Sequence, residues 1–304
     1  QLEKKRLFDY NQASDGMRQI VWGLYKKIVI ADNCAIITSQ VFNNYQGLPA
    51  SSLLLGSFLY TIQVYADFSG YSDLAIGYSR LLGFNITKNF NFPFFAQNIA
   101  EFWRKWHISL TSWFAEYVFT PLSITFRDYG RFGLILAILI NFTIIGFWHG
   151  ANWTYVLFGF MHGFCFLPLI LRCKLNKRGK AEGNKLFPKF SELINMSATF
   201  TFVMLTFIIF RSETIGHAYY YYRGLYSISL FSPPIIPFAN LKISLIIFIL
   251  LMVVTEWLQR GKEHGFQIDH ILNPVFRLAV YYTVIFIIII FSADTSNQFI
   301  YLKF

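Results

Sequence analysis

The sequence has 304 residues, of which 55% are hydrophobic, 20% aromatic and only 14% charged. Soluble domains carry about 25% charged residues, and a chain with a mean hydropathy of +0.44 has too little polar surface to cover a soluble fold of this length. The composition excludes a disordered chain, a collagen-like chain and a soluble globular enzyme, and it indicates lipid as the solvent. Membrane proteins gather lysine and arginine in cytoplasmic loops, which accounts for the formal net charge of +10, so no nucleic acid partner is expected.

The chain ends and the cysteines add three expectations. The sequence begins with Gln1 and shows no signal-peptide pattern, so we expect a segment of a longer protein that lacks some N-terminal spans. We also expect a single membrane domain over residues 1–304. The three cysteines have no metal-ligand spacing, so neither a metal site nor a disulfide framework is predicted.

Long apolar runs predict an all-α, polytopic membrane helix bundle. A spanning helix needs about 20 mostly apolar residues, and the clear candidates are Leu53–Gly77, Phe132–Trp148, Trp153–Leu171, Met196–Phe210, Leu241–Trp257 and Val275–Phe291. A seventh and weaker run, Met17–Val41, contains Lys26 and Lys27. It either spans the membrane with snorkelling lysines or lies amphipathically at the interface.

The distribution of basic residues predicts the orientation of the bundle. Arg172–Lys189 carries many lysines and arginines against a single acid, so the positive-inside rule places it in the cytoplasm. Counting spans from this loop also places Arg80–Arg131 and Arg260–His270 in the cytoplasm. The loops 43–52 and 212–240 and the C-terminal tail then lie outside.

The stretch Phe90–Tyr129 is aromatic throughout but contains charged residues. It is too polar for a lipid-facing span and too apolar for a solvated loop. This composition predicts re-entrant or interfacial helices, buried against the bundle and lining a cavity.

The first polar group interrupts an apolar run at Tyr-Ala-Asp-Phe-Ser-Gly-Tyr-Ser-Asp, residues 65–73. Acids inside a span are costly and face the bundle interior or water. Asp67 and Asp73 therefore either belong to a functional site or form a polar cluster that packs helices at the end of the span.

The second group, Phe-Trp-Arg-Lys-Trp-His-Ile-Ser-Leu-Thr-Ser-Trp, covers residues 102–113. On a continuous helix Trp103 and His107 are one turn apart and Thr111 follows on the same face, which predicts a dry pocket wall of indole and imidazole. The His107 imidazole there can titrate near neutral pH. The alternative is an interfacial belt that anchors an amphipathic helix.

The third group, Gly-Phe-Trp-His-Gly-Ala-Asn-Trp-Thr, covers residues 146–154, where Gly150 allows close approach of backbone or ligand. A buried, neutral His149 next to apolar rings suits a general base for a hydroxyl. The alternative is a tight turn capped by His149 and Asn152, with tryptophans at the membrane interface. Glycines flank His162, which favours a helix contact there. His217, His264 and His270 lie in predicted loops and receive no functional role.

Together these three motifs resemble the membrane-bound O-acyltransferase family (MBOAT), and within it most closely the branch of alginate O-acetyltransferases and D-alanyl-transfer proteins. Residues 23–32 and 299–304 also resemble that branch, so the resemblance covers nearly the whole chain. It implies a helix bundle around a central funnel or tunnel, with an acyl donor on the cytoplasmic side and an acceptor outside. It also implies that His149 is the catalytic histidine and that His107 is the second candidate.

Acyl transfer to a hydroxyl needs a base and a group that stabilises the oxyanion. We expect His149 to be the base, while His107 orients the acyl carbonyl or shares in proton handling. Arg104 and Lys105 would attract the phosphates of an acyl-CoA, expected to be acetyl-CoA as co-substrate, with no tightly bound cofactor. The residues expected to shape the pocket or tunnel are Trp106, Trp148, Asn152, Asp67 and Asp73.

The resemblance further implies a partner, an extracytoplasmic acetyltransferase, and a polysaccharide acceptor in O-acetylation of the cell envelope or an exopolysaccharide, at the bacterial inner membrane. Two alternatives remain open. In a proton- or ion-coupled transporter, Asp67, Asp73 and the histidines would form the ion path, although such proteins show internal repeats and this sequence shows none. A catalytically silent scaffold would tolerate the loss of both histidines.

Overall fold

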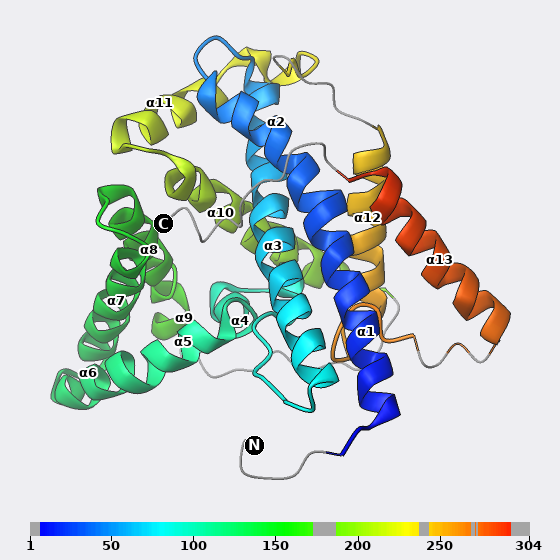
Figure 1. Cartoon of the computed structure of the whole chain (residues 1–304). Helices are drawn as coiled ribbons and strands as arrows, with labels where there is room; N and C mark the ends of the chain where they lie inside the picture. The colour runs from blue at the N-terminus through cyan, green and yellow to red at the C-terminus, as the bar shows by residue number, and fades with distance from the viewer. Residues whose placement is uncertain (1–6, 173–186, 237–242, 269–270, 272, 293–304) are drawn as a thin grey trace. The chain divides into compact units, whose positions relative to one another are not determined.

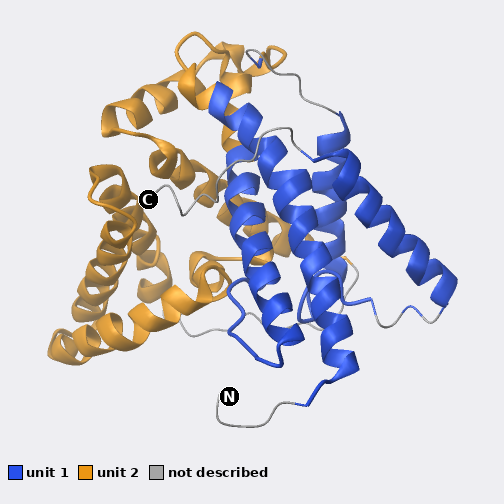
Figure 2. Ribbon diagram, in the orientation of Figure 1, with its two compact units in different colours: residues 1–40, 59–91, 236–303 blue, residues 41–58, 92–235, 304 orange. Residues whose placement is uncertain are grey.

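The computed structural model describes residues 7–172, 187–236, 243–268, 271 and 273–292. Within these residues all regular secondary structure is helical (Figure 1), which confirms the predicted all-α membrane class. The chain forms two compact units (Figure 2), unit 1 from residues 1–40, 59–91 and 236–303 and unit 2 from residues 41–58, 92–235 and 304. Most of the basic loop 172–189, together with Cys173, His270 and the tail 299–304, lies outside the described residues.

Unit 1 is built from the N-terminal helices, most of α3 and the C-terminal pair. Asp9 caps α1 (Tyr10–Leu24), because its carboxylate accepts the N–H groups of Asn11 and Gln12. The chain continues through a π-helical segment, η1 (Tyr25–Ala31), into α2 (Asp32–Asn43). The remaining helices are α3 (Ala50–Leu81), α12 (Ile243–Leu258) and α13 (Pro274–Ile290).

Facing glycines bring α1 and α3 into close contact. A Cβ added to Gly16 would lie 2.8 Å from the carbonyl oxygen of Gly77, and one added to Gly23 would lie 2.7 Å from that of Gly70. Small residues that let two backbones approach are typical of helix contacts in membranes. This contact carries η1, and with it Lys26 and Lys27, alongside α3.

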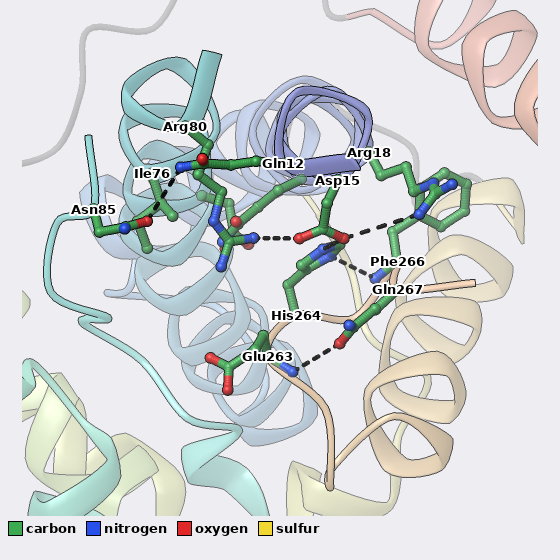
Figure 3. A network of polar contacts seen from close by, with 12 residues as sticks. Gln12, Asp15, Arg18, Ile76, Arg80, Asn85, Glu263, His264, Phe266 and Gln267 are labelled. Carbon is green, nitrogen blue, oxygen red and sulfur yellow. Dashed lines mark hydrogen bonds and ion pairs between the residues drawn. The ribbon is translucent and has the colours of Figure 1, made fainter. Parts of the chain in front are cut away.

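A polar cluster centred on Asp15 joins α1, the C-terminal end of α3 and the loop after α12 in unit 1 (Figure 3). The Asp15 carboxylate accepts from Arg80 of α3 and lies 3.1 Å from Nε2 of His264, in the loop after α12. His264 Nδ1 accepts a hydrogen bond from the N–H of Phe266 at 3.2 Å. The ring proton is therefore on Nε2, which donates a hydrogen bond to Asp15. His264 lies in a loop as predicted, but it is buried and ties that loop to α1 and α3.

Unit 2 contains the short helices that follow α3 and a group of longer helices. Its short elements are η2 (Pro93–Phe95), α4 (Ile99–Lys105), α5 (Ile108–Phe114), η3 (Ala115–Phe119), α6 (Thr120–Thr125), η4 (Arg127–Tyr129), α9 (Leu167–Leu171) and η5 (Ile228–Phe231). The longer ones are α7 (Gly130–Trp148), α8 (Trp153–Phe164), α10 (Phe190–Arg211) and α11 (Ile215–Leu225). His217 lies in α11 and stacks on Tyr45 at 4.4 Å, so its predicted loop position was wrong.

Three stretches, Arg127–Trp148, Trp153–Leu171 and Phe190–Arg211, are long and apolar enough to cross a membrane by length and composition. They confirm three of the predicted spans as apolar helices. Two further predictions correspond to shorter apolar helices, Ile243–Leu258 and Pro274–Ile290. Leu53–Gly77 lies within α3, whereas Met17–Val41 is interrupted by the π-helical segment.

The stretch Phe90–Tyr129 forms a chain of short helices. Two of its breaks fall on residues with left-handed backbone, Phe92 (φ 49°) and His107 (φ 46°), where non-glycine residues are uncommon. Neither break can continue a helix, so the aromatic residues are distributed over several short segments. Whether these segments are re-entrant or interfacial stays a prediction, as does the central funnel.

Candidate active site

The turn between α7 and α8 presents His149. Its N–H donates to the Gly146 carbonyl at 3.0 Å and ends α7. Gly150 follows with φ 149°, a value that favours glycine, and an added Cβ there would lie 2.9 Å from the ring of Tyr155. Asn152 then caps α8 by accepting the N–H of Thr154 at 3.1 Å. The tight turn expected around Asn152 is present, and it places His149 at a fixed position.

The His149 imidazole is enclosed by aromatic rings and is only 7% exposed. Ring centroids of Trp148 and Phe210 lie 5.0 and 5.1 Å away, both nearly perpendicular to the imidazole, and Phe158 lies at 6.5 Å. These contacts come from α7, α8 and α10, so three helices fix the orientation of one side chain.

His107 occupies the break between α4 and α5 and does not lie on a helix. The prediction that Trp103 and His107 share one helical face was wrong, because the left-handed backbone of His107 ends α4 and starts a new helix. The Thr111 hydroxyl donates to the His107 carbonyl at 2.7 Å and stabilises the break. The indole N–H of Trp103 donates instead to Nδ1 of His162 at 3.1 Å.

The structure brings the two candidate catalytic histidines to the same indole. The Trp148 ring lies 6.1 Å from the ring of His107 and 5.0 Å from that of His149, edge to face in both cases. Burial lowers the pKa of His107 to about 4, and burial together with the nearby His107 lowers the pKa of His149 to about 3. Both imidazoles are therefore neutral at pH 7, which corrects the expectation that His107 can titrate near neutrality.

Two predicted pocket residues support this arrangement from either side. Trp106 is buried, stacks on Phe102 at 5.3 Å and contacts Phe207 of α10 at 5.6 Å. Asn152 donates through its side-chain amide to the Glu213 carbonyl at 2.8 Å and so ties the His149 turn to the segment after α10. Trp106 and Asn152 thus hold the backbone next to His107 and His149, respectively.

A cavity of about 470 Å³ lies against the His107 break on the side of α5 and α7. Its volume falls in the range of small-molecule sites, and its wall is mostly apolar, with Arg104, Thr111, Ser112 and Asn141 as polar members. Asn141 is buried, and its Oδ1 atom has no hydrogen-bond partner among the residues that the structure describes. Arg104 is exposed, whereas the Lys105 ammonium lies 2.7 Å from Glu101 Oε1.

Asp67 and Asp73 belong to unit 1, where both are paired with lysines of η1. Lys27 Nζ lies 2.7 Å from Asp67 Oδ1, and Lys26 Nζ lies 2.6 Å from Asp73 Oδ2. Lys26 is 3% exposed, so it does not snorkel to the interface, and it also contacts Glu256 of α12 at 3.9 Å. The two acids are therefore parts of a buried ion network within unit 1.

Sequence reasoning missed two members of these polar clusters, Glu256 and Asn141, and did not identify the partners of Lys26. Glu256 and Asn141 each stand as a polar residue inside an apolar run, a signal that was present in the sequence and was given no weight. Lys26 was noticed, but its partners are far away in the chain and no local pattern identifies them.

Comparison with known proteins identifies the class. Residues 16–180 match the membrane-bound O-acyltransferase family, MBOAT, and the chain belongs to this family. The matched region contains both histidines and the Asp67–Asp73 segment.

Individual relatives act on different polymers according to their names. The chain is 34% identical over 226 residues to the probable alginate O-acetylase AlgI of Pseudomonas aeruginosa, a match over 73% of this chain and 40% of the relative. It is 31% identical over 230 residues to the peptidoglycan O-acetyltransferase of Helicobacter pylori, over 73% and 41%. It is 36% identical over 223 residues to the teichoic acid D-alanyltransferase of Streptococcus thermophilus, over 66% and 52%. The chain therefore spans about half or less of the length of these relatives.

Proposed function

We propose that this chain carries the active site of a membrane O-acyltransferase that moves an acyl group, acetyl in the first instance, from a thioester to a hydroxyl of a cell-envelope polymer. The observation that carries the proposal is the placement of two buried, neutral histidines against one indole. His107 and His149 lie in short breaks between helices, where side chains can approach a ligand. Family membership and the names of the relatives support the same reaction class.

In the proposed reaction His149 takes the proton of the acceptor hydroxyl while the hydroxyl oxygen attacks the thioester carbonyl carbon. The C–O bond forms, the C–S bond breaks, and the proton passes from His149 to the departing thiolate. A positioned base contributes about 10²–10⁴-fold. His107, in its neutral form, donates to the carbonyl oxygen as charge develops, a contribution of about 10²–10³-fold for one donor.

The cavity beside the His107 break is the proposed binding place for part of the thioester donor. Arg104 supplies an exposed positive charge for a phosphate of acyl-CoA. Asn141 is a buried polar member of the cavity wall, and its side-chain amide would orient a polar part of the donor. Lys105 contributes less to phosphate binding, because Glu101 already neutralises it.

The proposed setting is the bacterial inner membrane, with the thioester delivered from the cytoplasm and the acyl group leaving towards the outside. The acceptor is a polysaccharide or another wall polymer, in keeping with the names of the relatives. A separate extracytoplasmic acetyltransferase would complete the transfer to the polymer.

The test uses purified protein in lipid nanodiscs with acetyl-CoA and a soluble oligosaccharide, and it follows the release of free thiol. His149→Ala should reduce turnover by about 10²–10⁴-fold and His107→Ala by about 10²–10³-fold. His217→Ala is the matched control, because His217 lies in the same unit but stacks on Tyr45, and it should leave the rate unchanged. Full activity of the His149 variant would remove this residue from the mechanism.

A further inference from the structure

A buried chain of hydrogen bonds joins α4, α8 and α10 in unit 2. The indole N–H of Trp103 donates to Nδ1 of His162 at 3.1 Å, and Nε2 of His162 lies 2.9 Å from the Thr206 hydroxyl. Thr206 in turn donates to the Val203 carbonyl at 2.9 Å. His162 and Thr206 are completely buried and Trp103 nearly so.

The partners determine the protonation of His162. Because an indole N–H can only donate, Nδ1 must accept, and the ring proton resides on Nε2. Since the Thr206 hydroxyl donates its hydrogen bond to the Val203 carbonyl, the hydroxyl oxygen is available to accept a hydrogen bond from Nε2 of His162. All donors in the chain point in one direction, so the imidazole can satisfy both neighbours in a single orientation.

These hydrogen bonds hold α4, the helix that leads to His107. Helix α4 has seven residues, a length that is marginal without tertiary contacts, and Trp103 is its anchor to α8. Trp106 and His107 follow directly after the end of α4, so the position of the helix determines where the His107 break lies.

His162 also contacts the surroundings of His149. The Phe158 ring lies 4.4 Å from the His162 ring and 6.5 Å from the His149 ring. A displaced His162 would therefore shift one wall of the aromatic enclosure around His149.

We propose that His162 is a positioning residue, which fixes α4 through Trp103 and thereby holds His107 and the enclosure of His149 in register for acyl transfer. The inference goes beyond a simple helix contact and rests on the proposed function for its activity readout. It assigns no proton transfer to His162, whose two ring nitrogens are occupied by protein groups.

Two conservative variants separate the two hydrogen bonds. In His162→Asn the side-chain oxygen replaces Nδ1 and keeps the bond from Trp103, whereas in His162→Gln the amide nitrogen replaces Nε2 and keeps only the bond to Thr206. If anchoring of α4 is decisive, the Asn variant should retain more thiol release than the Gln variant. His162→Leu should lose about 10²-fold in kcat, the scale of a 1 Å misplacement. Its KM for acetyl-CoA should also rise, because Arg104 and part of the cavity wall lie on α4.

A double variant separates positioning from stability. Trp103→Phe alone leaves Nδ1 without its donor, whereas Trp103→Phe combined with His162→Leu removes both partners, a change that can be nearly neutral for stability. The double variant should therefore lose less stability than the two single variants added together and still show the loss in kcat. Recovery of both stability and kcat in the double variant would overturn the proposal.

Threonines of α10 provide a matched control. Thr206→Val removes the acceptor for His162, while Thr199→Val removes a hydroxyl that bonds to the Asn195 carbonyl of its own helix. Only Thr206→Val should lower kcat. Equal effects of the two variants would contradict a specific role of the chain.

Hydrogen–deuterium exchange of residues 99–108 gives a readout that does not depend on activity. His162→Leu should raise amide exchange in this segment, and His162→Asn should raise it less. Unchanged exchange in the Leu variant would overturn the proposal whatever its kcat. Absence of thiol release from the wild-type protein would refute the proposed function alone, since the exchange measurement still decides whether His162 holds α4.

Discussion

The contact between α7 and α8 gives the sharpest prediction, because it has no space for a methyl group. A Cβ added to Gly159 would lie 2.1 Å from the carbonyl oxygen of Phe142 and 2.9 Å from the amide nitrogen of Gly146. Non-bonded heavy atoms have their optimum at about 3.5–4.0 Å. Both opposing atoms are backbone atoms that cannot rotate away, so in Gly159→Ala the two helices must separate.

The magnitude follows from two opposing terms. Overpacking of a tight contact costs about 1–3 kcal/mol, and replacing glycine by alanine in a helix returns up to about 1 kcal/mol. Gly159→Ala should therefore lower the free energy of unfolding by about 1–2 kcal/mol. It should also lower thiol release, because His149 lies in the turn that joins the two helices.

The assay is reversible unfolding in mixed detergent micelles, with Gly216→Ala as control. At Gly216 an added Cβ meets nothing closer than the Thr214 hydroxyl oxygen at 3.7 Å, so this variant should be as stable as the wild type or slightly more stable. The reasoning is refuted if Gly159→Ala unfolds at the same denaturant concentration as Gly216→Ala.

Further predictions concern charge and pH. Because His149 stays neutral until the pH falls to about 3, while an unfolded histidine takes up a proton near pH 6.5, its contribution to stability decreases as the pH falls from 6.5 towards 3. The decrease is about 1.4 kcal/mol per pH unit, and unfolding curves of wild type and His149→Gln should converge at acid pH. The kcat/KM for acetyl-CoA should show no acid limb near pH 6.5, and a midpoint there would contradict the buried position of His149. Arg104→Ala should raise KM for acetyl-CoA and flatten its salt dependence, whereas Lys105→Ala should change both less. Asp73→Asn removes one partner of the buried Lys26 and leaves Glu256 at 3.9 Å, so the same unfolding assay should show a destabilisation below the roughly 3–5 kcal/mol of a fully uncompensated buried charge.

The helical class and most apolar helices could be predicted because they depend on composition and run length alone. Phe132–Trp148 and Trp153–Leu171 agree with the structure to within a few residues at most. Met17–Val41 could not be predicted in detail, since no local pattern marks its π-helical segment Tyr25–Ala31. Lys26 and Lys27 lie in that segment and pair with acids of α3. Neither of the two arrangements expected from the sequence, snorkelling or interfacial lysines, included lysines paired with acids of a neighbouring helix.

The two histidines show where local pattern suffices and where it fails. For His149 the neighbouring Gly150 and the two flanking apolar runs indicate a turn, and the structure has that turn. For His107 no glycine or proline marks a break, and helical periodicity therefore placed it above Trp103. The structure contradicts that placement, because the left-handed backbone of His107 interrupts the helix between α4 and α5.

The buried ions of unit 1 bear on the choice between an enzyme and an ion path. A conducting path needs carboxylates that exchange protons or ions in turn, but Asp67 and Asp73 are each held by a lysine within 2.7 Å. These pairs join η1 to α3 within unit 1, and each lysine also lies near a second carboxylate, Lys27 near Asp32 and Lys26 near Glu256. Side chains suited to chemistry lie instead in unit 2, where His107 and His149 are neutral and enclosed by rings. The lysine–carboxylate contacts of unit 1 therefore suit a structural role, and the enclosed imidazoles of unit 2 support the acyl transfer proposed above.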